Sequence, residues 1–481
     1  MNVTQTFGYS LNDGNCPELL GARVPQGRRA QIRDSLKTIH RMFLEEQAQG
    51  LETLQRNWRA WTTLHLPRDY AEVIDRTVTV AERVRRDFEV FVHVGIGGSD
   101  LGPRVCHEVL NSTLYNELPA ETRGAPRVYF AGDTFDPRPL RELLAFLESR
   151  GELHKTVFNI VSKSGKTPET LCAFLSIKDR LGPDWVRQMV FTTGEVPGSS
   201  ILYDLAAGRV EELAGLLPVP EGVGGRFSVP SPVGLLPLAV TAGVGETPRA
   251  RIEAALRGYG MAHDAGLLLP FDDDGKPNPE NIAFRLASWL QFAEEQGGVG
   301  TLVLYDYSAC RMLGDWLVQL YTESIQERGA GLNVTGARGP TSNHSLLNGV
   351  VSGPRDKVVL FVNWQDMGED LYVPADPSIE GSLQAFMDRQ MTNLNAASFE
   401  GTFADFRDQG VPALAITCPN RRVESLFFLM RVLMDTVAVK GRLQGLHVDQ
   451  DWELNLAKEL TYQQDGVEGY KEAMRRFLAG S

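Results

Sequence analysis

Residues 160–170 (IVSKSGKTPET) combine an apolar run with hydroxyl side chains, a glycine and two lysines. Where a buried strand turns into a helix, unpaired backbone N–H groups point outward at the positive end of the helix dipole, and Ser or Thr hydroxyls add donors. Lys163 or Lys166 could supply a full positive charge. The segment therefore predicts a binding site for an oxyanion such as phosphate. An ordinary Ser or Thr cap at a helix start is the alternative, because such caps are common.

A glycine-rich turn, residues 95–98 (GIGG), follows the strand-like run 88–94 (FEVFVHV). Its position is typical of a dinucleotide-binding turn, but that fingerprint needs a glycine where this chain has Asp100. An acidic side chain there would face a pyrophosphate. We therefore expect the backbone N–H groups and the Ser99 hydroxyl to approach a smaller oxyanion or a sugar. A strand-to-helix turn that merely needs glycine is equally compatible with the pattern.

Arg226 lies in a glycine-rich segment that suits a ligand contact, whereas Glu323 by its local pattern alone is a weak candidate. Arg226 follows two glycines in residues 221–228 (EGVGGRFS), and a delocalised guanidinium suits a developing oxyanion such as an enediolate. Glu323 lies in residues 321–324 (YTES), near the end of a helix expected from Ala309 onward. A surface turn and a solvated helical glutamate are the corresponding structural alternatives. Neither pattern assigns a function by itself.

Two further polar segments contain His344 and Lys471. His344 lies in residues 340–345 (PTSNHS), a polar segment rather than an apolar face, which weakens its interpretation as a core histidine without excluding it. Residues 462–471 (YQQDGVEGYK) end in Lys471. A solvated helix start is the default interpretation of such a charged stretch near the end of a chain.

The composition restricts the class of protein. A chain of 481 residues is too long for a single hydrophobic core. Its contents of 43% hydrophobic and 23% charged residues are typical of a globular protein. Five widely spaced cysteines without a C-x-x-C pair argue against a disulfide framework and a structural zinc site. A net charge of −13 without a basic stripe disfavours nucleic acid and anionic membranes as partners. We expect a cytoplasmic protein, because no apolar run reaches membrane-spanning length and the first residues lack a signal-peptide layout.

Strands and helices alternate along the chain in two groups. The expected strands are residues 88–94, 127–131, 156–162, 188–193, 300–305, 357–363 and 413–417. This alternation predicts an α/β fold with parallel sheets that are covered by helices on both faces. We expect a helical lead-in at 1–84, α/β domains at 85–270 and 271–448 with a boundary near the Gly/Pro/Asp-rich stretch 269–279, and a helical tail at 449–481. Ligand sites in such sheets lie beyond the carboxyl ends of strands, where residues 95–99 and 162–170 fall.

Together, five motifs resemble those of the glucose-6-phosphate isomerase family, in the family's order. They are the glycine turn at 95–103, the phosphate loop at 162–170, a first diagnostic stretch at 221–228, the Glu323-Ser324 pair and a second diagnostic stretch at 462–471. The motifs span most of the chain, and five in order are highly specific. The resemblance implies two sugar-isomerase domains of the αβα sandwich type, a homodimer, and interconversion of glucose 6-phosphate and fructose 6-phosphate without a cofactor or a metal ion.

The resemblance also implies a role for each site residue. Glu323 would be the base that moves a proton between adjacent carbons through a cis-enediol, and Arg226 would stabilise the enediolate. His344, reaching in from the partner subunit, and Lys471 would serve ring opening. Substrate and phosphate contacts are implied for Gly98, Ser99, Ser162, Lys163, Ser164, Thr167, Thr170 and Gln464.

Three positions depart from the family pattern. Lys166 stands where a hydroxyl residue is usual, Gln463 replaces the usual Asp or Asn, and residues 326–328 (QER) replace the Gly-Lys that follows the Glu-Ser pair. An isomerase that also accepts mannose 6-phosphate is one alternative. A non-catalytic sugar-phosphate sensor built from the same domains is another, but such a sensor would be expected to have lost the base, and Glu323 is present.

Overall fold

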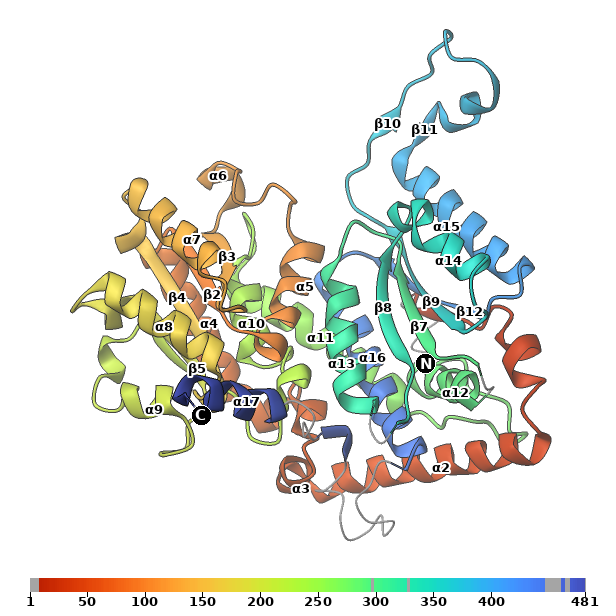
Figure 1. Cartoon of the computed structure of the whole chain (residues 1–481), viewed down its shortest axis with the longest axis horizontal. Helices are drawn as coiled ribbons and strands as arrows, with labels where there is room; N and C mark the ends of the chain where they lie inside the picture. The colour runs from red at the N-terminus through yellow and green to blue at the C-terminus, as the bar shows by residue number, and fades with distance from the viewer. Residues whose placement is uncertain (1–7, 296–297, 327–328, 446–459, 463–467, 481) are drawn as a thin grey trace.

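The computed structural model describes residues 8–295, 298–326, 329–445, 460–462 and 468–480. Two five-stranded sheets lie side by side, one formed by residues 90–218 and the other mainly by residues 301–420 (Figure 1). Helices cover both faces of each sheet, so the predicted α/β class with parallel sheets is confirmed. None of the helices in these ranges has the length and the apolar character of a membrane span.

The first sheet has the strand order β3-β2-β4-β5-β6, and all neighbouring strands are parallel. The strands are β2 (Val90–Val94), β3 (Arg127–Ala131), β4 (Thr156–Val161), β5 (Met189–Thr193) and β6 (Gly215–Pro218). The helices are α7 (Pro137–Ser149), α8 (Pro168–Leu181) and α9 (Ile201–Ala206) on one face, and α4 (Pro67–Asp87), α5 (Leu101–Leu110) and α10 (Pro232–Val240) on the other. Successive side chains of a strand point to opposite faces. Val92 therefore packs under the first group of helices and Phe91 under the second, which explains why these strands are apolar runs.

The second sheet has the strand order β1-β12-β9-β7-β8 and is parallel apart from β1. The strands are β1 (Ser10–Asn12), β7 (Thr301–Asp306), β8 (Asn333–Arg338), β9 (Lys357–Asp366) and β12 (Ala413–Asn420). The helices are α12 (Ile282–Glu295), α13 (Met312–Ile325) and α16 (Val423–Leu443) on one face, and α14 (Leu346–Val351) and α15 (Met391–Asp408) on the other.

Three strands of the two five-stranded sheets were not expected from sequence. The lead-in contains the expected helices α2 (Gln26–Gln49), α3 (Leu51–Arg56) and α4, but β1 joins the second sheet as an antiparallel edge strand. β6 (GLLP) and β8 (NVTGAR) are edge strands that were not expected, because Gly and Pro interrupt the first and polar or small residues dominate the second. In β8, Gly336 lies so close to α13 that a Cβ added there would stand 2.9 Å from Cα of Gly314. This close approach fixes α13 against the sheet.

The two halves of the chain share one large hydrophobic core. Helix α11 (Pro248–Leu267), which belongs to the first expected domain, packs along α16 of the second. Between them, Arg431 of α16 donates a hydrogen bond of 3.0 Å to His263 of α11 and is fully buried. The expected boundary stretch 269–279 forms the connection from α11 to α12. The domain limits stay a prediction, because no break in packing accompanies that connection.

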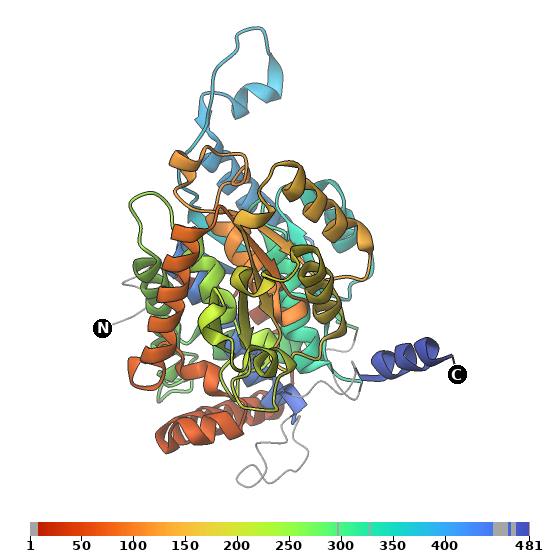
Figure 2. The same ribbon diagram turned by 90° about the vertical axis from the view of Figure 1, so that its left-hand side faces the viewer.

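Two pieces of the chain project from the body. Figure 2 shows one of them at the top, an arm of residues 367–390 that contains the short strands β10 (Tyr372–Val373) and β11 (Arg389–Gln390). The other is α17 (Glu468–Ala479), which extends sideways with the C-terminus. Both carry exposed apolar side chains: Leu371 is 70% and Phe386 56% exposed on the arm, and Phe477 is 84% exposed on α17.

Candidate active site

A buried guanidinium meets a partly exposed carboxylate between the two halves of the chain, where the turn after β6 contacts α13. Arg226 donates a hydrogen bond from an NH1 group to Oε2 of Glu323 at 3.2 Å. Its Nε donates to Oγ of Ser324 at 2.6 Å, and an NH2 group donates to the carbonyl of Thr461 at 2.6 Å. The Arg226 side chain is 1% exposed and that of Glu323 24%. The carboxylate is therefore fixed by a rigid donor but still open to a ligand.

The pair brings together the ends of two elements from different halves. Arg226 lies in a 3₁₀ turn after β6, beyond the carboxyl end of the first sheet, and Glu323 lies in the last turn of α13. The negative end of a helix dipole disfavours a carboxylate, and the guanidinium offsets that effect. Burial lowers the pKa of Arg226, and the neighbouring Glu323 acts in the opposite direction. Arg226 keeps its charge because guanidinium groups do not deprotonate in proteins.

The predicted glycine turn packs directly on the Arg226 turn. A Cβ added to Gly98 would lie 2.2 Å from the carbonyl carbon of Gly225 and 2.5 Å from the backbone nitrogen of Arg226. The hydroxyl of Ser228 also lies 3.3 Å from the carbonyl oxygen of Gly98. Gly98 has no positive φ angle, so the close approach of the two backbones, rather than the turn itself, requires a glycine at this position.

Gln319 is a residue near the pair that sequence reasoning missed. It precedes Glu323 by one turn of α13, and its Nε2 donates a hydrogen bond of 3.1 Å to Oε1 of Glu323. The same amide lies where a side chain on Gly97 would be, 2.8 Å from the added Cβ. The i, i+4 spacing to Glu323 on one helix face was the signal that could have indicated it. Gln319 and Arg226 thus hold the two oxygens of one carboxylate.

The predicted phosphate loop connects β4 to α8. Ser162 and Thr167 share a hydrogen bond of 3.1 Å between their hydroxyl groups. Gly165 has a φ of +63°, and an added Cβ would lie 2.9 Å from the backbone nitrogen of Ile201. Thr170 is buried, and its hydroxyl oxygen has no hydrogen-bond partner within the described residues. The loop thus gathers hydroxyl groups at the start of α8, where an anion is favoured.

Lys163 connects this loop to the stretch that carries Arg226. Its ammonium group donates a hydrogen bond of 3.0 Å to the carbonyl of Val223 and lies 4.5 Å from the ring centroid of Trp58. Burial lowers the pKa of Lys163, and Glu221 acts in the opposite direction. Lys166, by contrast, is exposed. The phosphate loop and the first diagnostic stretch are therefore in contact, whereas Lys166 joins the hydroxyl cluster only through its backbone nitrogen, which donates a hydrogen bond of 3.2 Å to the Ser164 hydroxyl.

His344 lies away from Glu323 within one chain. It is exposed and follows β8 at the carboxyl end of the second sheet. Glu323 lies near the opposite end of the sheet, where the parallel strands begin, because α13 ends just before the connection that leads into the first residue of β8. The six residues of β8 span about 20 Å. The structure thus brings Arg226 and Glu323 together but does not bring His344 to them.

The second diagnostic stretch is only partly described. Gln464 lies outside the described residues, and Lys471 is half-buried on α17. The hydroxyl of Tyr470, the residue before Lys471, lies 3.5 Å from Oε1 of Glu169 in the first turn of α8. The helix that carries Lys471 therefore begins beside the phosphate loop. Within the described ranges, no group of three or more His, Cys, Asp or Glu side chains could hold a metal ion.

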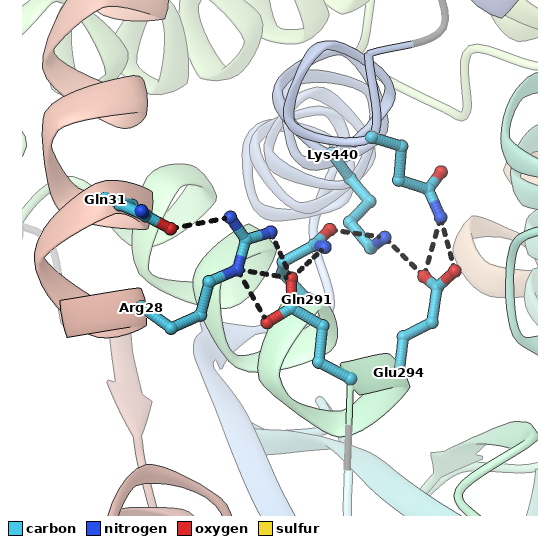
Figure 3. Close-up of polar contacts among 7 residues, drawn as sticks. Arg28, Gln31, Gln291, Glu294 and Lys440 are labelled. Atoms are coloured by element: carbon cyan, nitrogen blue, oxygen red, sulfur yellow. Dashed lines mark hydrogen bonds and ion pairs between the residues drawn. The ribbon is translucent and has the colours of Figure 1, made fainter. Parts of the chain in front are cut away.

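A buried polar network joins α12 and α16, and it was not predicted from the sequence. In Figure 3, Lys440 of α16 donates hydrogen bonds to Oε1 of Gln291 at 2.8 Å and to Oε2 of Glu294 at 2.5 Å. The other oxygen of Glu294 accepts a bond of 2.9 Å from the backbone nitrogen of Gly331, in the connection between α13 and β8. Burial lowers the pKa of Lys440 to about 8, against the effect of Glu294. The network ties the segment after Glu323 to α12 and α16.

Known proteins similar to this chain include enzymes and structures of one family. The sequence model of the phosphoglucose isomerase family matches residues 61–254. The glucose-6-phosphate isomerase of Rubrobacter xylanophilus is 34% identical over 418 residues, which cover 85% of this chain and 90% of the relative. That of Symbiobacterium thermophilum is 31% identical over 459 residues, covering 92% and 91%.

Solved structures agree with this relationship. A hypothetical protein of Thermus thermophilus superposes with a TM-score of 0.75 at 26% identity and covers 98% of this chain and 100% of its own. A glucose-6-phosphate isomerase from Chlamydia trachomatis shares the fold with a TM-score of 0.70 at 17% identity, covering 95% of this chain and 87% of its own. Because identity above 30% extends over most of both sequences, the chain belongs to the phosphoglucose isomerase family.

Proposed function

We propose that the protein interconverts glucose 6-phosphate and fructose 6-phosphate, in glycolysis and gluconeogenesis. The observation that carries this proposal is the Arg226–Glu323 pair, in which a partly exposed carboxylate is held at 3.2 Å by a buried guanidinium. Membership of the phosphoglucose isomerase family supports the same reaction. We also propose the cytoplasm as its location, because both pathways run there.

Glu323 is the proposed base of the isomerisation. The reaction moves a proton between two adjacent carbons through a cis-enediol, so one base on one face of the substrate serves both carbons. Such a base contributes about 10²–10⁴ in rate when it is well placed. Arg226 is a fixed, buried positive group beside the carboxylate. It would stabilise the negative charge that develops on the enediolate, as preorganised donors do in a water-poor site.

The loop from Ser162 to Thr170 is the proposed phosphate anchor. The start of α8 and the hydroxyls of the loop supply donors to a dianion. The residues to which we assign this role are Ser162, Lys163, Ser164, Thr167 and Thr170. Gly98, Ser99 and Gln464 are assigned to the sugar. Because Lys163 contacts Val223 directly, binding of phosphate at this loop would also fix the stretch that carries Arg226.

Ring opening requires a donor and an acceptor at the ring oxygen and the C1 hydroxyl, and we assign it to Lys471 and His344. Since His344 is exposed at the far edge of its own sheet, we propose that it acts in the site of a second copy in a homodimer. The exposed Leu371 and Phe386 of the arm and Phe477 of α17 support a partner, because apolar side chains on projecting elements are typical of subunit interfaces.

Replacement of Glu323 by Gln tests the proposed function. The purified protein is incubated with fructose 6-phosphate in deuterated water, and deuterium at C2 of the product is measured by NMR. We expect Glu323→Gln to lower the exchange rate about 10²-fold or more, with sugar-phosphate binding retained in calorimetry. Glu142→Gln, in an exposed ion pair with Arg141, is the matched control and should exchange like the wild type. Undiminished exchange in Glu323→Gln would exclude the assigned base.

A further inference from the structure

Three polar side chains lie among apolar residues on the face of the first sheet that packs against α4, α5 and α10. They are His93 of β2, Asn159 of β4 and Thr192 of β5, on three neighbouring strands, and each is 0% exposed. All three belong to strands in which each residue is buried. A buried polar group costs free energy unless it is hydrogen-bonded. Each of the three side chains therefore needs a hydrogen-bond partner inside the protein.

The three side chains form one chain of hydrogen bonds that ends at the glycine turn. The Thr192 hydroxyl donates to Oδ1 of Asn159 at 2.8 Å, and Nδ2 of Asn159 donates to Nδ1 of His93 at 3.3 Å. The Nε2–H group of His93 then donates to the carbonyl oxygen of Ser99 at 2.7 Å. Each group donates toward the turn.

This direction selects one state of the imidazole. The Ser99 carbonyl can only accept, so Nε2 of His93 carries the proton, and Nδ1 is free to accept from the Asn159 amide. Burial lowers the pKa of His93 to about 4, and the bond to Ser99 acts in the opposite direction. The ring is therefore neutral at neutral pH and held in a single tautomer.

We propose that His93 is a positioning residue for the substrate-binding turn, held in one tautomer by Asn159 and Thr192. Its bond fixes the Ser99 carbonyl, and the preceding residue of that turn, Gly98, rests on the backbone of Arg226. Arg226 in turn holds Glu323. The core of the first sheet thus sets the position of the sugar contacts relative to the base. This inference rests on the proposed function, because it takes Ser99 as a substrate contact.

Replacing His93 by Leu and by Gln separates positioning from packing. His93→Leu leaves the Ser99 carbonyl without its donor, and a lost buried hydrogen bond of this kind corresponds to about a tenfold or larger fall in kcat/KM. His93→Gln places an amide N–H close to the position of Nε2 and should recover kcat/KM to within about threefold of the wild type. Phe158→Leu, in the cluster on the opposite face of the same sheet, is the matched control for lost packing.

The kinetic outcomes are compared well below the unfolding temperature of each variant. We expect Phe158→Leu to lower Tm but to keep the wild-type kcat/KM. His93→Leu should lower kcat/KM even when its decrease in Tm equals that of Phe158→Leu. Equal kinetics for His93→Leu and His93→Gln would overturn the proposal. So would a fall in kcat/KM for Phe158→Leu as large as that for His93→Leu. Failure of the proposed function is distinct, since the wild type would then not isomerise the sugar phosphate at all.

Thr192→Val provides a second variant in case His93→Leu does not fold. The change is nearly isosteric and removes the hydroxyl donor to Asn159, so the amide loses its fixed orientation. In protein labelled with ¹⁵N-histidine, we expect the wild type to show His93 in the Nε2–H tautomer alone. Thr192→Val should add a detectable population of the other tautomer and lower kcat/KM by about threefold, less than the loss of the direct donor. An unchanged tautomer and unchanged kinetics would overturn the proposal.

Discussion

Arg226 and Glu323 are 97 residues apart in sequence and belong to different halves of the chain, yet an NH1 group of Arg226 lies 3.2 Å from Oε2 of Glu323. Arg226 follows the last strand of the first sheet, and Glu323 ends a helix that covers the second. The pair therefore exists only when the two halves are packed together. Its geometry depends on the α11–α16 contact and on the close approach of Gly98 to the Arg226 turn.

Arg226→Lys should inactivate the protein although it keeps the positive charge. One ammonium group cannot reproduce the planar set of bonds to Glu323, Ser324 and the Thr461 carbonyl. We expect kcat/KM to fall about 100-fold, the size of effect seen when a fixed oxyanion donor is lost. Arg249→Lys, in an exposed pair with Asp75, is the matched control and should leave steady-state kinetics unchanged. A kcat/KM of Arg226→Lys within threefold of the wild type would contradict the role of the planar guanidinium and its three hydrogen bonds.

Gly98→Ala should damage both stability and activity. The added methyl group would lie 2.2 Å from the carbonyl carbon of Gly225, so the two backbones must separate. We expect a loss of about 1–3 kcal/mol in the free energy of unfolding, with a fall in kcat as Arg226 moves. Gly401→Ala, a helical position in α15 where an added Cβ meets no atom within 4 Å, should be neutral or up to about 1 kcal/mol stabilising. Urea unfolding and steady-state kinetics of both variants test this prediction. Equal unfolding free energies and equal kcat values for Gly98→Ala and Gly401→Ala would exclude the close approach of the two backbones.

The central strands and the edge strand β3 could be predicted from sequence, whereas the strands β1, β6 and β8 and the site geometry could not. The runs that became β2 and β4 are buried on both faces, so apolar content alone indicates them. β8 (NVTGAR) has no such run because most of its residues are only partly buried, and its Gly336 serves contact with α13. The phosphate loop was recognisable because its donors are consecutive in sequence.

The partners of the site residues come from distant segments, which a single sequence does not reveal. The spacing of motifs places Arg226 and Glu323 in order but gives no distance between them. Gln319 was missed although its i, i+4 spacing to Glu323 was a usable signal, whereas a His in an apolar strand gives no indication of its hydrogen bond to Ser99. The assignments of His344, Lys471 and Gln464 stay predictions.

Lys440→Met should destabilise the protein by removing one member of a buried pair. The Lys440 side chain is 0% exposed, and that of Glu294 is 20% exposed and would lose its cation. We expect a loss of about 3 kcal/mol in the free energy of unfolding. The double variant Lys440→Met, Glu294→Gln should recover most of it, because a Gln can still accept from the Gly331 backbone. A loss below about 1 kcal/mol for the single variant would contradict the pairing.

The same lysine gives a dependence of stability on pH. The pKa of Lys440 is lowered to about 8 in the folded protein, against about 10.4 in an unfolded chain. Between these values the unfolded chain binds more protons, so the contribution of Lys440 to stability rises with pH. Below about 8 both states are protonated and the contribution is constant. The difference in unfolding free energy between the wild type and Lys440→Met should therefore grow from pH 8 to pH 10, and a flat difference would exclude the lowered pKa.

Mixing two inactive variants tests whether His344 acts across a dimer. His344→Ala keeps Glu323, and Glu323→Gln keeps His344, so a mixed dimer contains one site with both groups if the histidine comes from the partner. Random exchange between symmetric dimers then restores about a quarter of the wild-type sites. The control mixes His344→Ala with the double variant His344→Ala, Glu323→Gln. That mixture contains no intact site in any combination of chains. Full subunit exchange, verified by mass spectrometry of tagged chains, without recovered activity would show that His344 does not complete the partner's site.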